Sequence, residues 1–357
     1  MKKKKINIFL GGFINLTNAQ NLNCYALAKH LDKKIFKLYS LELYSGNLAS
    51  QKGKITGLKI FNCFYPAKIS IFLGFLWGIW NCDIAYLPKS ELWRWNNFWL
   101  NLLNKKSFST MEGIIDEIAL KNAIEIMGSE EKYLISRKKF DKQFSITNYM
   151  KNYNYKKRGI HTEKKILYLG VNSEDFNINT KKKSLKQVIM IGNDLVRKGI
   201  YDYLELAKKF PDILFFIAGS GNGKIDINTE SKKKKLKNVI YKGLVKKDQL
   251  IYLFKNCDLH ILPSKSEGFP KVTLETAAAG IPSLVYSDYG ADEWIKHNHN
   301  GWVVNSIDDM IETIKNLINN PELLVLNSKN AKKLAKKFDW KNIIKHWEEE
   351  IIKLYHN

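Results

Sequence analysis

The chain has 357 residues, of which 45% are hydrophobic and 26% are charged. This composition is ordinary for a soluble globular protein, and it excludes wholesale disorder, a collagen-like chain and a disulfide scaffold. Lysine and arginine outnumber the acidic residues by 58 to 35, which gives a formal net charge of +23. We therefore expect anionic partners such as nucleotides, phospholipids, nucleic acid or acidic glycans, although charge alone does not choose among them.

The cysteine pattern and the apolar runs indicate a reduced, cytoplasmic protein. The four cysteines form no CxxC pair and lack the spacing of metal ligands. The lysine-rich start and the apolar run behind it are not followed by a small-residue cleavage site, so we interpret the run as a buried strand. The longest apolar stretch, Ile71–Trp80, is about half of the ~20 residues that a membrane-spanning helix needs.

Strands alternate with helices along residues 1–165. Strands are expected at 6–10, 34–39, 58–63, 83–87, 106–110, 131–135 and 165–168, and helices at 18–31, 69–80, 92–103, 114–126 and 137–152. This alternation predicts parallel strands that are joined by crossover helices.

A polar, lysine-rich segment, 166–186, is the predicted linker to a second alternating series at 187–337. In that series strands are expected at 188–191, 213–218, 238–241, 258–262, 283–286 and 302–304, and helices at 199–209, 248–256, 273–279, 291–297, 306–319 and 321–337. A last helix is expected within 338–357. The predicted fold class is α/β, with two Rossmann-like, doubly wound domains that face a central cleft. Ligands of such sheets bind at the carboxyl ends of the strands.

The richest turn of this kind is Pro263–Pro282, between a strand and a helix that ends at Gly280. Two acidic residues, Glu267 and Glu275, flank its loop with seven residues between them. A helix N-terminus attracts phosphates, and a carboxylate accepts hydrogen bonds from neighbouring hydroxyls. This pattern predicts one glutamate for a sugar ring and one for a ribose. The alternatives are a solvated loop charge for Glu267 and a dipole-stabilising acid for Glu275.

A second turn, Ile191–Ile200, places Arg197 and Lys198 side by side before Gly199. Two cations at a strand end suit a diphosphate leaving group, because they neutralise the charge that grows as the bond to the sugar breaks. The alternative is a solvated pair on the surface of a lysine-rich chain.

Further glycine turns follow strands at Ala218–Gly223 and Lys242–Val245, and Gly11-Gly12 is the corresponding turn of the first domain. Glycine lets the backbone approach a phosphate or an acceptor closely. One such turn is a weak signal, but their repetition at strand ends favours a ligand site there.

Together these features resemble the retaining GT-B glycosyltransferases of family 4, the glycosyl transferases group 1. The glutamate pair within Ser266–Glu275 is the most specific feature, and Lys198-Gly199 follows Gly192 at the family's usual spacing. The stretch Tyr168–Phe176 resembles the family's interdomain segment, and the last helix resembles the one that crosses back to the first domain. The resemblance covers nearly all of the second domain and little of the first.

The resemblance implies roles for the residues of these motifs. Glu267 would hold the donor sugar, Glu275 would bind the ribose, and Arg197 with Lys198 would clamp the diphosphate. Leu244 would contact the base through its backbone. The remaining donor-binding residues would be Gly12, Asn193, Gly219, Gly268, Phe269, Pro270, Lys271 and Val272. The family needs no cofactor and no catalytic metal; a nucleotide-diphosphate sugar, most often a UDP-sugar, is its co-substrate.

Two positions depart from the family pattern. Many members carry arginine where this chain has Asn193, and Arg197 would supply that charge instead. Many members also have a first-domain histidine that faces the reacting centre, and we assign Glu112 to this catalytic place. The histidines at 161, 260, 297 and 299 are interpreted as structural or solvated.

Five of the nine tryptophans lie in the two segments 71–80 and 92–103. Ordinary core helices are one interpretation. The other is a face that rests on an anionic membrane surface, with nearby lysines such as Lys2–Lys5 on the headgroups. The lysine run 232–235 is interpreted as a solvated loop.

We therefore predict a retaining, metal-independent hexosyltransferase. It would use a nucleotide-diphosphate sugar and a glycan, lipopolysaccharide, capsule or lipid-linked acceptor, in the cytoplasm or on the inner face of the plasma membrane. No nucleic-acid partner is expected, because the sequence has no nucleic-acid motif. The alternatives are a basic membrane-surface or nucleic-acid binder on a GT-B scaffold, and a GT-B epimerase or phosphorylase.

Overall fold

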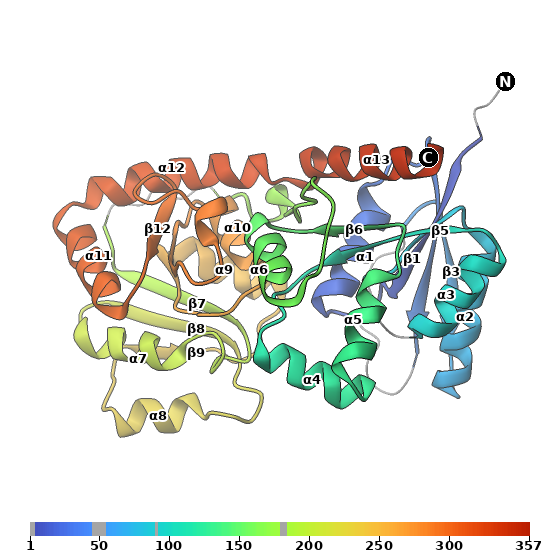
Figure 1. Cartoon of the computed structure of the whole chain (residues 1–357). Helices are drawn as coiled ribbons and strands as arrows, with labels where there is room; N and C mark the ends of the chain where they lie inside the picture. Colours follow the sequence, from blue (N-terminus) through green and yellow to red (C-terminus); the bar gives the residue numbers. More distant parts are fainter. Residues whose placement is uncertain (1–3, 45–54, 90–91, 179–183) are drawn as a thin grey trace. The chain divides into compact units, whose positions relative to one another are not determined.

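A computed structural model describes residues 4–44, 55–89, 92–178 and 184–357 (Figure 1). The chain divides into two compact units: unit 1 is Met1–Leu169 with Trp340–Asn357, and unit 2 is Gly170–Asp339. The first boundary falls inside the segment 166–186 that was predicted as a linker. Residues 179–183 of that segment, and Lys2 and Lys3 of the predicted lysine cluster, lie outside the described residues. The cleft between the units stays a prediction.

Unit 1 is built on a parallel sheet of six strands in the order β3-β2-β1-β4-β5-β6. The chain starts in the middle of the sheet, winds to one edge and then returns to build the other, which is the doubly wound order of a Rossmann fold. The strands are β1 (Ile6–Phe13), β2 (Phe36–Leu43), β3 (Leu58–Cys63), β4 (Ile84–Tyr86), β5 (Lys106–Met111) and β6 (Lys142–Ser145). The helices are α1 (Ala19–His30), α2 (Ala67–Asn81), α3 (Trp93–Leu102), α4 (Glu117–Met127), α5 (Glu130–Lys138) and α6 (Asn148–Arg158).

Two glycines let α2 lie directly on the sheet of unit 1. A Cβ atom at Gly78 would lie 2.3 Å from the ring of Phe9 in β1, and one at Gly74 would lie 3.0 Å from Leu41 in β2. Phe75 and Ile79 point to the same side and belong to the buried core of this unit. The glycines therefore fix which face of α2 packs inward.

Unit 2 repeats the same strand order, β12-β11-β10-β7-β8-β9, again with all strands parallel. The strands are β7 (Gln187–Asn193), β8 (Leu214–Ser220), β9 (Val239–Tyr241), β10 (Leu259–Leu262), β11 (Ser283–Tyr286) and β12 (Gly301–Val304). The helices are α7 (Ile200–Lys209), α8 (Ile227–Lys233), α9 (Lys247–Asn256), α10 (Lys271–Ala278), α11 (Ile307–Asn319) and α12 (Pro321–Lys337), with short 3-10 turns η2 (Ser173–Phe176) and η3 (Ala291–Glu293). The point where the winding direction changes lies between β7 and β10.

The last helix, α13 (Trp340–His356), belongs to unit 1 although it follows α12 of unit 2 (Figure 1). Trp347 is fully buried, and its indole Nε1 donates to the carbonyl of Tyr168 at 3.0 Å. Trp340 stacks on His30 of α1, with 6.0 Å between the ring centroids. The C-terminal segment is therefore an integral part of the core of unit 1.

Three sequence predictions in unit 1 were wrong. Residues 131–135 form part of α5 and not a strand, and residues 137–152 contain the end of α5, β6 and the start of α6 and not one helix. The missed signal is the cap of α5, because the Ser129 side chain accepts from the backbone N–H of Lys132 and acidic residues fill the first turn. Gly11 and Gly12 lie inside β1, at a shift of its register with β2, and not in a turn behind it.

Smaller differences concern short elements. The strand expected at 165–168 is a single bridge between Ile166 and Ser145, and the helix expected at 291–297 is reduced to η3. The helix α8 was missed because its sequence is polar and has little amphipathic pattern. It is set by its N-cap Asp226, whose carboxylate accepts from two backbone N–H groups. The lysine run 232–235 begins in the last turn of this helix.

In the described part of the chain, every helix is too short or too polar to cross a lipid bilayer.

The contact between α2 and β1 gives a first prediction. Gly78→Ala should lower the free energy of unfolding by roughly 1–3 kcal/mol, because the added methyl group overlaps the Phe9 ring and outweighs the better helix propensity of alanine. Gly74→Ala is the comparison variant and should cost clearly less, since a Cβ there would lie 3.0 Å from the nearest atom of Leu41 and not 2.3 Å from a ring. Urea unfolding measures both, and a Gly78→Ala protein as stable as the wild type would contradict this packing.

Candidate functional site

The candidate site of unit 2 lies at the carboxyl ends of β7 and β10, where the winding of the sheet changes direction. The loop 194–199 connects β7 to α7, and the loop 263–270 connects β10 to α10. Ligands of doubly wound sheets bind at this position, because neighbouring loops diverge there and helix N-termini converge.

A buried ion pair joins the two loops. The ammonium Nζ of Lys198 lies 2.8 Å from Oε1 of Glu267. These residues are only 8% and 7% exposed. Arg197 Nη1 lies 3.4 Å from Oε2 of the same carboxylate and donates to the carbonyl of Ser266 at 2.6 Å. The structure therefore brings together the predicted diphosphate clamp and the predicted sugar ligand.

Close backbone packing holds these loops in place. A Cβ at Gly199 would lie 1.8 Å from the carbonyl oxygen of Pro263, and Gly199 has a φ of +83°. A Cβ at Gly192 would collide with the Lys198 side chain at 2.2 Å. Gly219, predicted to bind the donor, packs in the same way, since its Cβ would lie 1.8 Å from the carbonyl oxygen of Gly192. These glycines allow the contact that positions Lys198 against Glu267.

The loop before α10 combines a buried ring with a half-exposed helix start. Phe269 packs between Trp294 and Phe338, with centroid distances of 4.8 and 5.9 Å, so its ring belongs to the core. Pro270 is the buried N-cap of α10, while Gly268, Lys271 and Val272 are half-buried. The predicted role of this loop around the hydroxyls of a sugar stays a prediction.

Glu275 lies in the second turn of α10 and is half-buried. Desolvation raises the pKa of its carboxyl above the ordinary value, and the ammonium groups of Lys271 and Lys247 lower it in part. Hydroxyl groups of a ligand would stabilise the charged form of this carboxylate, because their hydrogen bonds replace those of the water that burial has removed.

Two other predicted donor residues, Asn193 and Leu244, lie at the surface. Asn193 ends β7 and is exposed, and Leu244 follows β9 with 74% of its surface exposed. A nucleotide base could cover the exposed Leu244 side chain and remove it from water. This role of Leu244 stays a prediction.

Two buried polar side chains near the ion pair were not predicted as site residues. His260 of β10, interpreted from the sequence as structural or solvated, is fully buried, and its Nδ1 lies 2.9 Å from Ser283 Oγ. Burial and the neighbouring charge of Lys198 lower its pKa to about 3, so the ring stays neutral at physiological pH. It therefore adds no third positive charge beside Lys198 and Arg197.

Tyr289, which follows β11, is also fully buried. Burial first, and then the charge of Glu267, raise the pKa of its hydroxyl well above the ordinary value. Within the described residues this hydroxyl has no hydrogen-bond partner. The local sequence of Tyr289 does not mark it as a site residue, and its position just after a predicted strand was the one signal that could have indicated it.

Unit 1 places Glu112 just after β5. Its Oε1 accepts hydrogen bonds from Thr110 at 3.1 Å and from the buried Tyr86 at 3.2 Å. Glu112 lines a hollow of about 400 Å³, together with the start of α1 and Arg137 of α5. The predicted first-domain carboxylate is therefore held in a fixed orientation at the edge of a cavity.

Gly12 has a packing reason for its identity. A Cβ at this position would lie 2.7 Å from Cys24 Sγ in α1, so the glycine lets the helix approach the strand. Its predicted contact with the donor stays a prediction. Among the described residues, no group of three or more histidine, cysteine or acidic side chains could hold a metal ion.

Comparisons with known proteins relate the chain to glycosyltransferases. Residues 171–334 match the family model described as glycosyl transferases group 1. An uncharacterized glycosyltransferase of Methanocaldococcus jannaschii is 28% identical over 255 residues, which are 68% of this chain and 67% of that protein. The N,N'-diacetylbacillosaminyl-diphospho-undecaprenol alpha-1,3-N-acetylgalactosaminyltransferase of Campylobacter jejuni is 32% identical over 50% of this chain and 46% of that protein.

The chain spans between about half and two thirds of the length of the first curated relatives. Among solved structures, Anabaena HepE in complex with UDP and glucose has a TM-score of 0.77 at 13% identity, over 98% of this chain and 100% of that one. At this identity the likeness concerns the fold, which is GT-B.

The ion pair gives a prediction about stability. Glu267→Gln should cost roughly 3–5 kcal/mol of unfolding free energy, because it strands the buried ammonium of Lys198. Lys198→Met should cost less, since Arg197 still faces the carboxylate, and the double variant should cost less than the sum of both.

The control is Lys224→Met, which breaks the exposed pair with Asp194 and should cost below about 1 kcal/mol. Urea unfolding of all four variants measures these differences. Strict additivity of the two site substitutions would show that the pair is not coupled in the folded protein.

Proposed function

We propose that this chain, whose residues 171–334 match the family model of the glycosyl transferases group 1, is a retaining glycosyltransferase. It moves a hexose from a nucleotide-diphosphate sugar, preferentially a UDP-sugar, to a glycan or lipid-linked acceptor. The reaction breaks the bond between the sugar and the diphosphate, the oxygen of the acceptor hydroxyl takes its place on the sugar, and the hydroxyl proton leaves with the nucleoside diphosphate. The chain's own cations serve the leaving group, so the reaction needs no metal.

The buried ion pair of Lys198 with Glu267, which the exposed Arg197 joins at 3.4 Å, is the observation that carries this proposal. Two cations face one carboxylate, so the described group carries an excess of positive charge. Charge pairs this deeply buried are a poor source of stability, because desolvation offsets their attraction. A diphosphate that binds there supplies the missing negative charge, and the ammonium has further donors to offer it.

The same contact supports a role for Glu267. Its carboxylate is already held by Lys198 at 2.8 Å, so it is oriented before a ligand arrives. We assign it to the hydroxyls of the donor sugar, next to the diphosphate that the two cations bind. As negative charge builds on the leaving diphosphate, Lys198 and Arg197 neutralise it from fixed positions, which lowers the barrier.

Glu275 is assigned to the ribose, where two neighbouring hydroxyls would donate to its half-buried carboxylate. The exposed side chain of Leu244 and its backbone are assigned to the base. That HepE was solved with UDP and glucose supports a uracil base and a hexose. The relative from Campylobacter jejuni, named for a lipid diphosphate acceptor, supports an acceptor of this class.

Glu112 is assigned to the acceptor side of the reaction. Hydrogen bonds from Tyr86 and Thr110 fix Oε1. The hollow of about 400 Å³ beside it has room for one sugar ring of an acceptor.

A donor screen tests the activity. The full chain is incubated with UDP-, GDP- and ADP-sugars, and release of the nucleoside diphosphate is measured with and without candidate acceptors. A Lys198→Ala/Glu267→Gln double variant, purified in parallel, controls for contaminating hydrolases. If folded protein neither binds nor releases any nucleoside diphosphate, the proposal fails.

Lys198→Ala should lower kcat/KM about 10²–10³-fold, which corresponds to roughly 3–4 kcal/mol of lost stabilisation of the transition state. Steady-state kinetics with the best donor measures this change. Lys224→Ala removes an exposed lysine near the same loop and should leave the rate unchanged. Near-normal turnover by folded Lys198→Ala protein would contradict the assignment.

The two glutamates should separate in a binding experiment. Glu275→Gln should weaken the affinity for free UDP, because a neutral amide replaces the acceptor of two ribose hydroxyls. Glu267→Gln should leave the affinity for UDP largely intact and weaken that for the UDP-sugar. Isothermal titration calorimetry with both ligands measures this, and the reverse order would refute the division of roles.

A further inference from the structure

The outward faces of α2 and α3 in unit 1 are apolar. In α2 the exposed side chains Ile69, Leu73 and Trp80 form one stripe, and in α3 Trp95, Phe98 and Leu102 form another, at spacings that place each set on one helix face. These six side chains, the α2/α3 face, are between 47% and 66% exposed.

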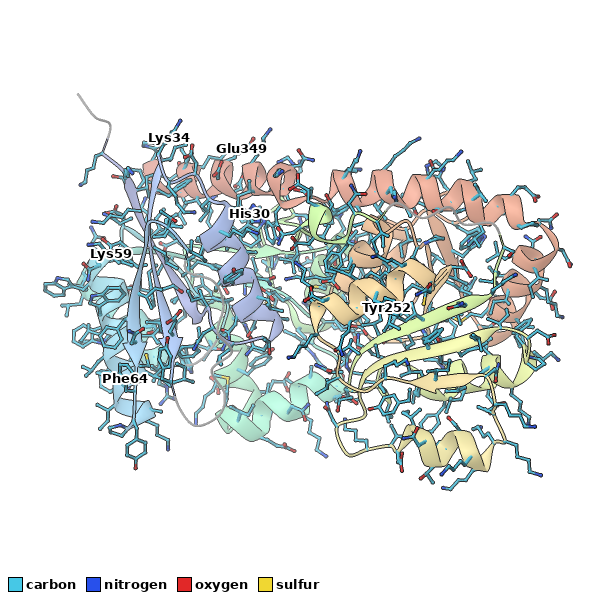
Figure 2. All side chains as sticks on the ribbon, turned by 180° about the vertical axis from the view of Figure 1, so that it is seen from behind. His30, Lys34, Lys59, Phe64, Tyr252 and Glu349 are labelled. Atoms are coloured by element: carbon cyan, nitrogen blue, oxygen red, sulfur yellow. The ribbon has the colours of Figure 1, made fainter. Side chains whose placement is uncertain are left out.

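The two stripes lie next to each other. The helices α2 and α3 pack together, and Phe72 of α2 meets Trp95 of α3 edge to face with 5.5 Å between the ring centroids. Phe64 and Tyr65, just before α2, are also exposed, at 56% and 89%. Figure 2 labels Phe64 at the outer edge of this part of unit 1, where ring side chains project outward.

The opposite faces of both helices are already used by the core. Gly74, Phe75, Gly78 and Ile79 of α2 are buried, as are Asn96 and Leu100 of α3. The helix α2 is thus apolar on both sides although it lies at the surface. A surface helix normally turns polar residues outward, and contiguous apolar patches mark sites of interaction.

The charges beside the face indicate what covers it. The sequences of α2 and α3 contain Lys68 and Arg94, both exposed, and no acidic residue. Lys59 of β3, the strand that leads to Phe64, is also exposed. Cations at the edge of an apolar face complement anionic headgroups above an acyl layer, whereas two copies of the face would bring like charges together.

The exposed rings fit the same partner. Trp80 and Trp95 combine a large apolar body with a polar N–H, and tryptophan is enriched where a membrane meets water. We infer that the α2/α3 face docks reversibly on a lipid surface with anionic headgroups. The six side chains enter the boundary between headgroups and acyl chains, and Lys68 and Arg94 contact the headgroups. This inference is independent of the proposed transferase activity.

Vesicle sedimentation of the full chain tests it. Vesicles of phosphatidylcholine alone are compared with vesicles that contain phosphatidylglycerol, at low and at high salt. The wild type should sediment with the anionic vesicles at low salt, remain in the supernatant with neutral vesicles, and be released as salt screens the attraction. A wild type that stays in the supernatant with anionic vesicles at low salt overturns the inference.

A matched pair of variants locates the contact. Leu73→Ser/Leu102→Ser alters the α2/α3 face and should lower binding to anionic vesicles roughly tenfold or more. Ile318→Ser/Leu326→Ser changes similarly exposed side chains of α11 and α12 in unit 2 and should bind like the wild type. Equal binding by both double variants overturns the assignment to this face.

Two further measurements keep the outcome clear. If light scattering shows a dimer that Leu73→Ser/Leu102→Ser dissociates, and vesicles bind neither form, a second copy covers the face and the inference is wrong. Urea unfolding of the same samples verifies that each variant is folded. UDP affinity measured beside it separates a failure at the lipid surface from a failure of the proposed donor site.

Discussion

The candidate site depends on one short contact, the 2.8 Å approach of Lys198 to Glu267. The two residues come from loops 69 positions apart in the sequence, so the contact exists only if β7 and β10 are neighbours. It also requires the loop backbones to touch, which Gly199 permits because a Cβ there would overlap Pro263. The contact between Lys198 and Glu267 thus depends on the strand order, on the glycine at 199 and on the attraction between opposite charges. The neutral state of His260 is consistent with this arrangement, since a charged imidazole would repel the neighbouring ammonium of Lys198.

The sequence was most informative where chemistry is local. Glu267, Gly268 and Glu275 lie within one loop and helix start, and their spacing alone indicated the site. The strands of unit 2 were also predictable, because each is a short apolar run between turn signals. By contrast, Tyr289 could not be found from its neighbours, since its burial beside Glu267 depends on how β11 and η3 pack. In unit 1, α5 was mistaken for a strand because its apolar run is short, and the capping Ser129 decided otherwise.

The helix α2 illustrates why composition does not determine burial. Its sequence is apolar around the whole circumference, so periodicity could not indicate an inner face. The choice is made by Gly74 and Gly78, which allow close contact with β1 and β2 and leave Ile69, Leu73 and Trp80 outside. The core interpretation of the tryptophan-rich segments holds for the inner side of each helix, and the lipid interpretation of the outer side stays a prediction. One side of each helix fills the core, and the other remains at the surface as a candidate for lipid contact.

The chain has 58 basic and 35 acidic residues, and its basic residues attract anions in two ways. Exposed ones act over a long range, and the buried Lys198 acts only on a ligand in direct contact. Exposed lysines such as Lys59 and Lys68 attract any anionic surface, and salt weakens this attraction over a Debye length of about 8 Å at physiological ionic strength. Lys198 is different, because burial shields it from salt and Glu267 fixes its direction. A buried cation with a set orientation distinguishes ligands by geometry, whereas the surrounding charge only concentrates them. Long-range attraction brings anions to the chain, but the proposed selectivity for a diphosphate next to a sugar requires the few side chains at the ends of β7 and β10.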